Sequence, residues 1–364
     1  MKVAILGAGH GGQAMAADLT LGGHEVRFAA VPAHAANLNI LKAFGGIYLE
    51  GVTSSGKPPG FAKIALMTTD VAEAVKGAKV VMVVIPAFGQ ECYMQELIRC
   101  AEPGQIIVFN PGKFASLLFA RMLREAGRDD LTIGETGILI YAAKMKGLGH
   151  VRIKAVKSDV YFAAFPSVKT APTLLTLMDL FYQLVPAYNV VQTSVDDVAI
   201  TLHPITTLMN ASRIEQMGPY RNAHYDITPS VGRVIEAVDA ERIAVSKMFR
   251  YETLSFLEMY DMMYKVKGKS AYEVVMNVEA YNIQMSPENL QHRYITEELP
   301  YVLVPLSALA RAAGIKTPGI DCIVQLGSMA NGVDYWKTGR TLEKLGLNGL
   351  SIPDLIRYVT YGKA

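Results

Sequence analysis

One histidine of the chain is placed where it can do proton chemistry. In the stretch ITLHPITTLMNASR, His203, Thr207 and Asn210 are spaced i, i+4 and i+7, so a helix puts them along one face. An imidazole titrates near neutral pH and can act as a general acid or base. Pro204 predicts a kink, or a restart of the helix, directly after the histidine. From the spacing alone, a partly buried structural histidine is the favoured alternative.

A second group of chemically capable residues lies in the stretch NLQHRYITEELPYVLVPL. Arg293, Glu297 and Glu298 precede an apolar helix-like run there, with His292 beside them. A guanidinium can bind a substrate carboxylate through two hydrogen bonds, and a carboxylate can orient an imidazole and stabilise its protonated form. The alternative is a solvated charged loop with a helix cap. The sequence does not place Glu298 against His203.

The third candidate is the glycine cluster of the N-terminal stretch MKVAILGAGHGG. Residues 3–6 predict a buried strand, and Gly7, Gly9 and Gly12 follow as G-x-G-x-x-G before a helix-like stretch. In a dinucleotide site the first glycine permits the turn, the second admits the pyrophosphate and the third allows close helix packing. We therefore expect these glycines and His10 to bind a nicotinamide cofactor at the helix N-terminus. A glycine-rich turn without a ligand is the alternative.

The end of the second predicted strand bears on the choice between NAD and NADP. An NAD site usually has an acidic residue there, about 20 residues after the glycines. Here the strand ends FAAVPAH, so Ala30 stands where a carboxylate is expected, and nothing repels a 2′-phosphate. No Arg follows, although Arg27 lies in the strand and His34 just beyond it. The pattern favours NADP, or tolerance of both nucleotides.

Strand-like and helix-like stretches alternate through the rest of the first half, which predicts a doubly wound parallel sheet. Ligands of such sheets bind beyond the carboxyl ends of the strands. Three such ends are expected near Pro86, Asn110 and Thr136, and together they predict one rim. We expect Pro86, Asn110 and Ala30 to contact the cofactor and Thr136 to contact the substrate. An ordinary loop is the alternative at each end.

The apolar pattern changes near residue 190, after which the stretches are long and typical of helices, for example 196–217 and 230–251. The predicted fold class is therefore α/β: a Rossmann-type domain over residues 1–190, followed by an all-α domain over 191–364. The second domain is expected to supply the catalytic and substrate-binding residues, Asn210 included. Its Met- and Tyr-rich stretch 259–264 suggests an apolar amine pocket, with core or a dimer interface as alternatives.

Composition excludes several classes of partner. Lys+Arg 35 nearly balance Asp+Glu 33, so a nucleic-acid-binding surface is not expected. The longest apolar run, VVMVVIPAF, is about half of the ~20 residues that a membrane-spanning helix needs. The three cysteines form no C-x-x-C pair, which argues against a disulfide framework or a zinc site. We expect a cytoplasmic homodimer without a metal, acting on small molecules.

Taken together, the motifs resemble those of the opine dehydrogenases, the octopine/nopaline dehydrogenase family. The resemblance covers nearly the whole chain and is strongest to the bacterial norvaline-type members. It rests on the segments LGAGHGGQAMAADL, NPGK, IGETG, HPITTLMNA, ITPSVG, DAERIA, RYITEELP, LVPLSALARAAGIKTPGID and GRTLEKLGLNGL. The histidine-proline and RYITEE segments are the specific ones, because the glycine motif is shared with other reductases.

This resemblance implies a reaction. An α-keto acid such as pyruvate condenses with the amine of an amino acid, and the imine takes a hydride from NAD(P)H. By resemblance, His203 is the catalytic acid/base, Glu298 is its carboxylate partner and Arg293 binds a substrate carboxylate. Two positions depart from the family: Glu298 stands where Asp is more common, and Ala30 where the norvaline-type members carry an acidic residue.

Two other functions remain open at this point. One is the simple reduction of a 2-keto acid, as in ketopantoate-type reductases, which commonly rely on a lysine. The other is an NAD(P)-sensing protein without catalytic activity. A requirement for a keto acid alone, for a keto acid with an amine, or nucleotide binding without turnover would distinguish the three.

Overall fold

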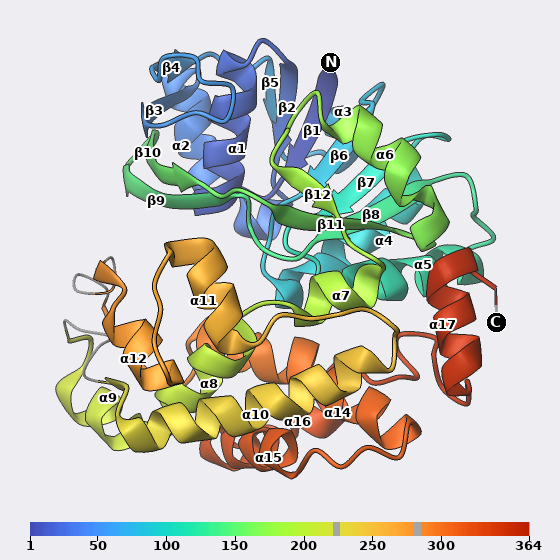
Figure 1. The fold of residues 1–364 in the computed structure, drawn as a ribbon. Coiled ribbons are helices and arrows are strands. Elements are labelled where there is room, and N and C mark those ends of the chain that lie inside the picture. The colour runs from blue at the N-terminus through green and yellow to red at the C-terminus, as the bar shows by residue number, and fades with distance from the viewer. Residues whose placement is uncertain (221–225, 280, 282–284, 364) are drawn as a thin grey trace. The chain divides into compact units, whose positions relative to one another are not determined.

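The computed structural model describes residues 1–220, 226–279, 281 and 285–363. The chain forms two compact units, of which the first comprises Met1–Thr193 with Tyr358–Lys363 and the second Ser194–Arg357. In Figure 1 the first unit contains the strands with their flanking helices, and the second contains helices.

The first unit is built on an eight-stranded sheet of order β12-β11-β8-β7-β6-β1-β2-β5. From β8 to β5 neighbouring strands are parallel, as the predicted doubly wound sheet requires, whereas β11 is antiparallel to β8 and parallel to β12. The strands are β1 (Lys2–Leu6), β2 (Glu25–Ala29), β5 (Leu66–Thr68), β6 (Val80–Val83), β7 (Ile106–Phe109), β8 (Thr132–Thr136), β11 (Val160–Phe165) and β12 (Leu184–Pro186).

A second, four-stranded sheet of order β4-β3-β10-β9 is absent from the sequence prediction. Its strands are β3 (Ile47–Gly51), β4 (Phe61–Ala62), β9 (Tyr141–Gly147) and β10 (His150–Val156). The helices of this unit are α1 (His10–Leu21), α2 (Ala36–Phe44), α3 (Val71–Val75), α4 (Gln90–Cys100), α5 (Ala115–Glu125) and α6 (Thr170–Leu177), and α7 (Val190–Val195) follows at its end. Short 3₁₀ turns are η1 (Pro32–His34), η2 (Ala87–Gly89) and η3 (Ser167–Lys169).

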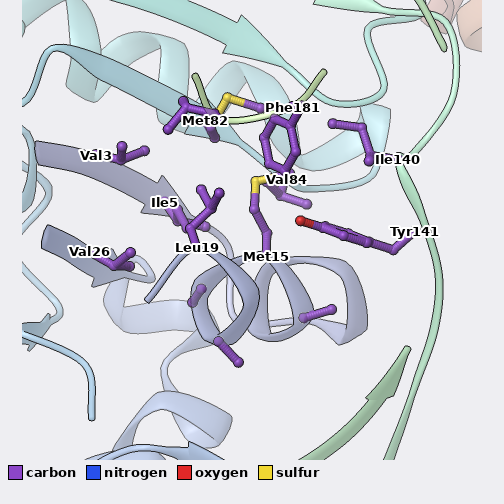
Figure 2. Packing of buried hydrophobic residues seen from close by; sticks show 14 of the residues in the cluster. Val3, Ile5, Met15, Leu19, Val26, Met82, Val84, Ile140, Tyr141 and Phe181 are labelled. Carbon is purple, nitrogen blue, oxygen red and sulfur yellow. The ribbon is translucent and has the colours of Figure 1, made fainter. Parts of the chain in front are cut away.

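Helix α1 packs between the two sheets, since it contacts β1 and β2 on one side and β3, β9 and β10 on the other. Strands β6 and β7 are buried along their whole length, which explains their uninterrupted apolar sequence. Figure 2 shows Val3 and Ile5 of β1 beside Leu19 and Met15 of α1, with Tyr141 of β9 also close to Met15. Burying each such aliphatic side chain contributes about 1.5–3 kcal/mol.

A buried carboxylate joins α1 to the small sheet. Asp18 accepts hydrogen bonds from the Ser54 backbone N–H (3.0 Å), the Ser54 hydroxyl (2.5 Å) and the Tyr141 hydroxyl (2.7 Å). Burial raises the pKa of Asp18 above its ordinary value, although these hydrogen bonds act in the opposite direction.

The regular elements of the second unit are helices, so its all-α class agrees with the sequence prediction. They are α8 (Ala199–Met209), α9 (Ala211–Met217), α10 (Pro229–Lys247), α11 (Phe256–Tyr264), α12 (Ala271–Met276), α13 (Arg293–Thr296), the π-helix η6 (Leu299–Leu303), α14 (Val304–Ala312), α15 (Pro318–Asn331) and α16 (Tyr335–Thr338). The last helix, α17 (Ile352–Tyr361), begins in this unit, and its final residues belong to the first. The predicted restart at Pro204 is wrong, because α8 runs through the proline and ends at Met209.

Arg242 of α10 forms a buried ionic centre in this unit. Its guanidinium is 0% exposed, and it donates to Asp239 (2.8 Å), Asp196 (2.9 Å) and Thr253 (2.9 Å). Removing one partner of such a buried pair typically costs about 3–5 kcal/mol, because it leaves a buried charge uncompensated. Asp239 and Arg242, which lie in the DAERIA segment, therefore stabilise the fold.

Asp18 gives the stability of the first unit a predicted pH dependence. Because the folded-state pKa of Asp18 is raised, its contribution is present at acid pH and is lost as the pH rises through that pKa. We expect the Asp18→Asn variant to lose less unfolding free energy than the parent between about pH 4 and about pH 7. Urea denaturation at both pH values measures this. Asp129→Asn, at an exposed carboxylate, is the control, and a parental slope in Asp18→Asn would contradict the assignment.

Candidate active site

Two of the three motif glycines are required by the fold itself. Gly7 follows β1 with φ +114°, a conformation that side chains rarely adopt. A Cβ at Gly12 would lie 1.8 Å from the carbonyl oxygen of Gly7, so only glycine lets α1 pack this closely on the turn.

Gly9 has no such internal reason. A Cβ at Gly9 would meet no atom within 4 Å, and its φ of −80° and ψ of −172° suit any residue. It is the N-cap of α1, and no side chain caps that helix. The open space thus lies beside uncapped backbone N–H groups and the positive end of a helix, which suits a phosphate. These features fit the pyrophosphate of a dinucleotide.

The strand register places the other predicted cofactor positions at the same edge of the sheet. Leu6 of β1 is level with the last residues of β2 and β6, and β7 and β8 continue this register. Ala30, Asn110 and Thr136 therefore lie at or next to the carboxyl ends of neighbouring strands, and Pro86 lies in the loop after β6. The Asn110 amide donates to the Thr136 hydroxyl (2.7 Å), which donates to the Ile138 carbonyl (3.0 Å).

Two side chains near this edge have partners within the first unit. The His10 Nδ1 atom accepts a hydrogen bond from the Met145 N–H of β9 (2.9 Å). The Arg27 guanidinium donates to the carbonyls of Glu73 (2.8 Å) and Lys76 (2.9 Å) at the end of α3. Arg27 is thus engaged elsewhere, whereas His34 lies exposed in η1, directly after β2.

In the helical unit, His203 of α8 pairs with Glu298. Their Nδ1 and Oε1 atoms are 3.1 Å apart, and the side chains are 18% and 3% exposed. The structure therefore makes the contact that the sequence left open, and the longer Glu side chain does reach the imidazole. A carboxylate at Nδ1 orients the ring, stabilises its protonated form and leaves Nε2 as the atom that can exchange a proton with a ligand.

Tyr294 covers one face of the His203 imidazole. The sequence analysis did not identify this residue. Its ring stacks on His203 with centroids 3.7 Å apart and an interplanar angle of 9°. The ring of His292 meets Tyr294 edge-on at 4.4 Å, and its Nδ1 accepts from the Tyr294 N–H (3.3 Å). Burial, aided by the charge of Arg293, lowers the pKa of His292. The only sequence signal for Tyr294 was its place inside RYITEE.

Arg293 is more available to a ligand than the buried Arg242. Its side chain is 56% exposed, and Nη1 lies 3.4 Å from Glu297, which is buried. This single contact of one Nη atom leaves the other N–H donors of the guanidinium for a carboxylate ligand. Arg242 is instead saturated by its neighbours.

Asn210, expected to contact the substrate, lies just after α8. Its amide donates to the carbonyls of Thr206 (2.9 Å) and Asp226 (2.9 Å), and so ties the helix end to the segment before α10. Thr207 is buried, and its hydroxyl donates to the His203 carbonyl (2.7 Å). The substrate contact of Asn210 stays a prediction.

A recess that is partly open to solvent adjoins the histidine within the helical unit. His203 and Tyr294 line it together with aliphatic side chains such as Leu202, Ile227 and Val275. A recess of this composition suits a ligand with an apolar body.

Two other kinds of feature are absent from the described parts of the chain. No group of three or more His, Cys, Asp or Glu side chains there is arranged to hold a metal ion. Among these residues, no helix is both long enough and apolar enough to cross a membrane.

Comparison with known proteins bears on both units. A family model described as "NAD/NADP octopine/nopaline dehydrogenase, alpha-helical domain" matches residues 186–331, and one described as "NADP oxidoreductase coenzyme F420-dependent" matches residues 2–108. The chain is 38% identical, over 352 residues, to an opine dehydrogenase of Arthrobacter sp. (strain 1C), and the match covers 96% of each chain. The chain belongs to the opine dehydrogenase family.

Opine dehydrogenases are NAD(P)-dependent oxidoreductases acting on CH–NH bonds. An octopine dehydrogenase structure with NADH and L-arginine matches with a TM-score of 0.81 and 20% identity, covering 100% of this chain and 98% of that one. A yersinopine dehydrogenase structure with NADP⁺ matches with a TM-score of 0.72 and 15% identity, covering 99% and 98%. The predicted family resemblance and fold class are both confirmed.

The same substitution, Gly to Ala, has different expected effects at Gly9 and at Gly12. Gly12→Ala forces a Cβ against the Gly7 carbonyl and should destabilise the protein by about 1–3 kcal/mol. Gly9→Ala should cost less than about 1 kcal/mol, yet it should weaken the binding of NADH and NADPH, since its methyl group enters the proposed phosphate space. Denaturation without nucleotide and fluorescence titration with each nucleotide measure the two effects. Parental nucleotide affinity in Gly9→Ala would show that this space is not used.

Proposed function

We propose that this chain catalyses the NAD(P)H-dependent reductive condensation of an α-keto acid, such as pyruvate, with the amine of an amino acid or a related amine. The observation that carries the proposal is the His203–Glu298 pair beside a largely apolar recess, in a chain whose other unit offers a dinucleotide cradle. Membership of the opine dehydrogenase family supports it.

His203 moves the protons of this reaction. Its Nε2 takes a proton from the incoming ammonium, which frees the nitrogen lone pair for attack on the keto carbon. The attack gives an alkoxide and a protonated nitrogen, and a proton passes from this nitrogen to the alkoxide to form the carbinolamine. His203 then returns its proton to the carbinolamine hydroxyl, which leaves as water and yields the iminium. Glu298 stabilises the imidazolium between these steps, and Tyr294 keeps the ring plane fixed. The bound nicotinamide supplies the hydride that reduces the iminium carbon.

Arg293 binds the carboxylate of the keto acid in this scheme. Its exposed guanidinium has one weak ion pair, with Glu297, among the described residues. A planar guanidinium matches a carboxylate through two parallel hydrogen bonds, which fixes the orientation of the adjacent carbonyl. Thr136 and Asn210 remain proposed substrate contacts.

For the cofactor, we propose that NADPH is used in preference to NADH, or that both are used. No carboxylate stands at Ala30 to repel a 2′-phosphate, and the exposed His34 follows directly in η1. Gly7, Gly9, His10, Gly12, Pro86 and Asn110 are the other proposed cofactor contacts.

We further propose a cytoplasmic homodimer. The free thiols of Cys92, Cys100 and Cys322 suit a reducing compartment. Leu175, Met178 and Tyr182 are exposed on and after α6, and such apolar surface favours a protein contact. Sedimentation velocity distinguishes a dimer from a monomer.

The proposed reaction is tested by nicotinamide absorbance with pyruvate, amines, and both together. We expect oxidation of NADPH or NADH only when a keto acid and an amine are both present. Oxidation with the keto acid alone would establish a 2-keto acid reductase instead. Tight nucleotide binding without turnover would support a sensing role.

Two variants separate the proposed roles. His203→Asn should lower kcat by about 10²–10⁴-fold with unchanged nucleotide affinity, because the proton shuttle is lost. Arg293→Ala should mainly raise the KM for pyruvate, by about 10–100-fold, because a charged hydrogen-bond donor is lost. Steady-state kinetics and nucleotide titration measure these effects, with His150→Asn in the small sheet as control. Unchanged turnover in His203→Asn, or an Arg293→Ala effect confined to the amine, would reassign the residue.

A further inference from the structure

The hairpin formed by β9 and β10 of the small sheet carries an excess of positive charge. Residues 141–156 include Lys144, Lys146, Arg152 and Lys154, and they include no Asp or Glu. All four of these side chains are exposed. None of them takes part in the proposed proton transfers. An exposed surface of one charge sign attracts ligands of the opposite sign, so this hairpin suits an anionic partner.

The strand register places two of these charges directly beside each other. Arg152 of β10 is opposite Lys144 of β9, so both side chains lie on the same face of the sheet. Val151 and Ile153, which flank Arg152 in β10, are fully buried, and the charged face is therefore the one turned away from the core. Like charges directly opposite each other on neighbouring strands are destabilising. This pair therefore does not contribute to the stability of the sheet.

The carboxylate of Glu50, on the neighbouring strand β3, offsets part of this charge. Its oxygen atoms lie 3.4 Å from Nε of Arg152 and 3.2 Å from Nε2 of His150. In the part of the chain that the structure describes, the three lysines of the hairpin form no ion pair with a carboxylate. Four positive side chains against one carboxylate leave this surface with a net positive charge.

The hairpin lies next to the proposed phosphate space. Met145, the residue between the two lysines of β9, donates its backbone N–H to the Nδ1 atom of His10 (2.9 Å). His10 is the first residue of α1 and follows the N-cap Gly9. Consecutive Cα atoms are about 3.8 Å apart, so the Cα atoms of Lys144 and Lys146 lie within about 8 Å, the Debye length at physiological salt, of this contact. Their electric field therefore acts on an anion that approaches Gly9.

We propose that the β9–β10 hairpin is an electrostatic guide for the dinucleotide, which speeds its association and favours NADPH over NADH. The proposal rests on the nucleotide part of the proposed function and does not depend on which substrates react. A charged surface beside a site raises the local concentration of an oppositely charged ligand, and such fields increase association rates by about 10–10³-fold. The 2′-phosphate gives NADPH up to about two more negative charges than NADH, so the same field attracts it more strongly.

The test measures association and dissociation of both nucleotides by stopped-flow fluorescence of the reduced nicotinamide. Lys144→Gln/Lys146→Gln should lower the association rate constant of NADPH by about 3–10-fold at low salt, and that of NADH by less. The dissociation rate constants should stay at their parental values, because the lysines guide the ligand and do not hold it. The difference in association should disappear at about 0.5 M salt, where screening shortens the Debye length.

A matched variant controls for total charge. Lys76→Gln/Lys79→Gln removes the same two charges from exposed side chains before β6, at the amino end of the sheet and so opposite to the glycine turn. It should leave both association rate constants within about twofold, because these lysines lie beyond the reach of the screened field. Lys144→Arg/Lys146→Arg keeps the charge of the hairpin and should keep the parental rate constants.

Several results would overturn the proposal. An equal loss in the two Gln variants would reflect total charge alone. A loss that persists at high salt, or that lies in dissociation, would indicate a direct contact with the nucleotide. Parental rate constants in Lys144→Gln/Lys146→Gln, or a loss in the Arg variant as large as in the Gln variant, would exclude a role for the charge.

Failure of the proposed reaction gives a different result. If no amine supports oxidation with pyruvate, the reaction assignment fails, but the association measurements still test the guide, because they need the nucleotide and no turnover. An absence of nucleotide binding by the parent protein would overturn both the proposed function and the guide.

Discussion

The hydrogen bond between His203 and Glu298 is the contact on which the proposed chemistry of the helical unit depends. It joins side chains 95 positions apart, one in the middle of α8 and the other just before the π-helix η6. The nearly buried carboxylate restricts the imidazole at one edge, and Tyr294 covers one of its faces. An imidazole constrained in this way offers a single ring nitrogen in a defined direction, which is what a proton shuttle requires.

In the helical unit, the degree of burial distinguishes charged side chains that stabilise the fold from those that can bind a ligand. Arg242 is fully buried and its donors are taken by Asp196, Asp239 and Thr253, so it has no capacity for a substrate. Arg293 is exposed and has one long contact. Both arginines lie in segments that carry the family resemblance, yet the physical environment gives them different tasks.

The glycine motif divides in a similar way. Gly7 is explained by its backbone conformation and Gly12 by the approach of α1 to the turn, so both would be needed even without a ligand. Gly9 is explained by neither, and the space it leaves lies at an uncapped helix N-terminus. We propose that the phosphate of a bound nucleotide, which this space suits, is the reason for this glycine. The small sheet adds to this region, because its strand β9 supplies the backbone N–H that binds His10.

The sequence was sufficient to predict those elements that depend on residues close together in the chain. Continuous apolar runs predicted the buried parallel strands, the glycine spacing predicted the turn into α1, and the change of apolar period predicted the helical unit. The sequence did not predict the small sheet, the antiparallel pairing of β11, or the stack of Tyr294 on His203. Each of these depends on residues far apart in the chain, whose meeting is decided by the packing of whole elements. Residue type and spacing therefore nominated the chemical groups, and only tertiary packing decided which of them are paired, saturated or left available for a ligand.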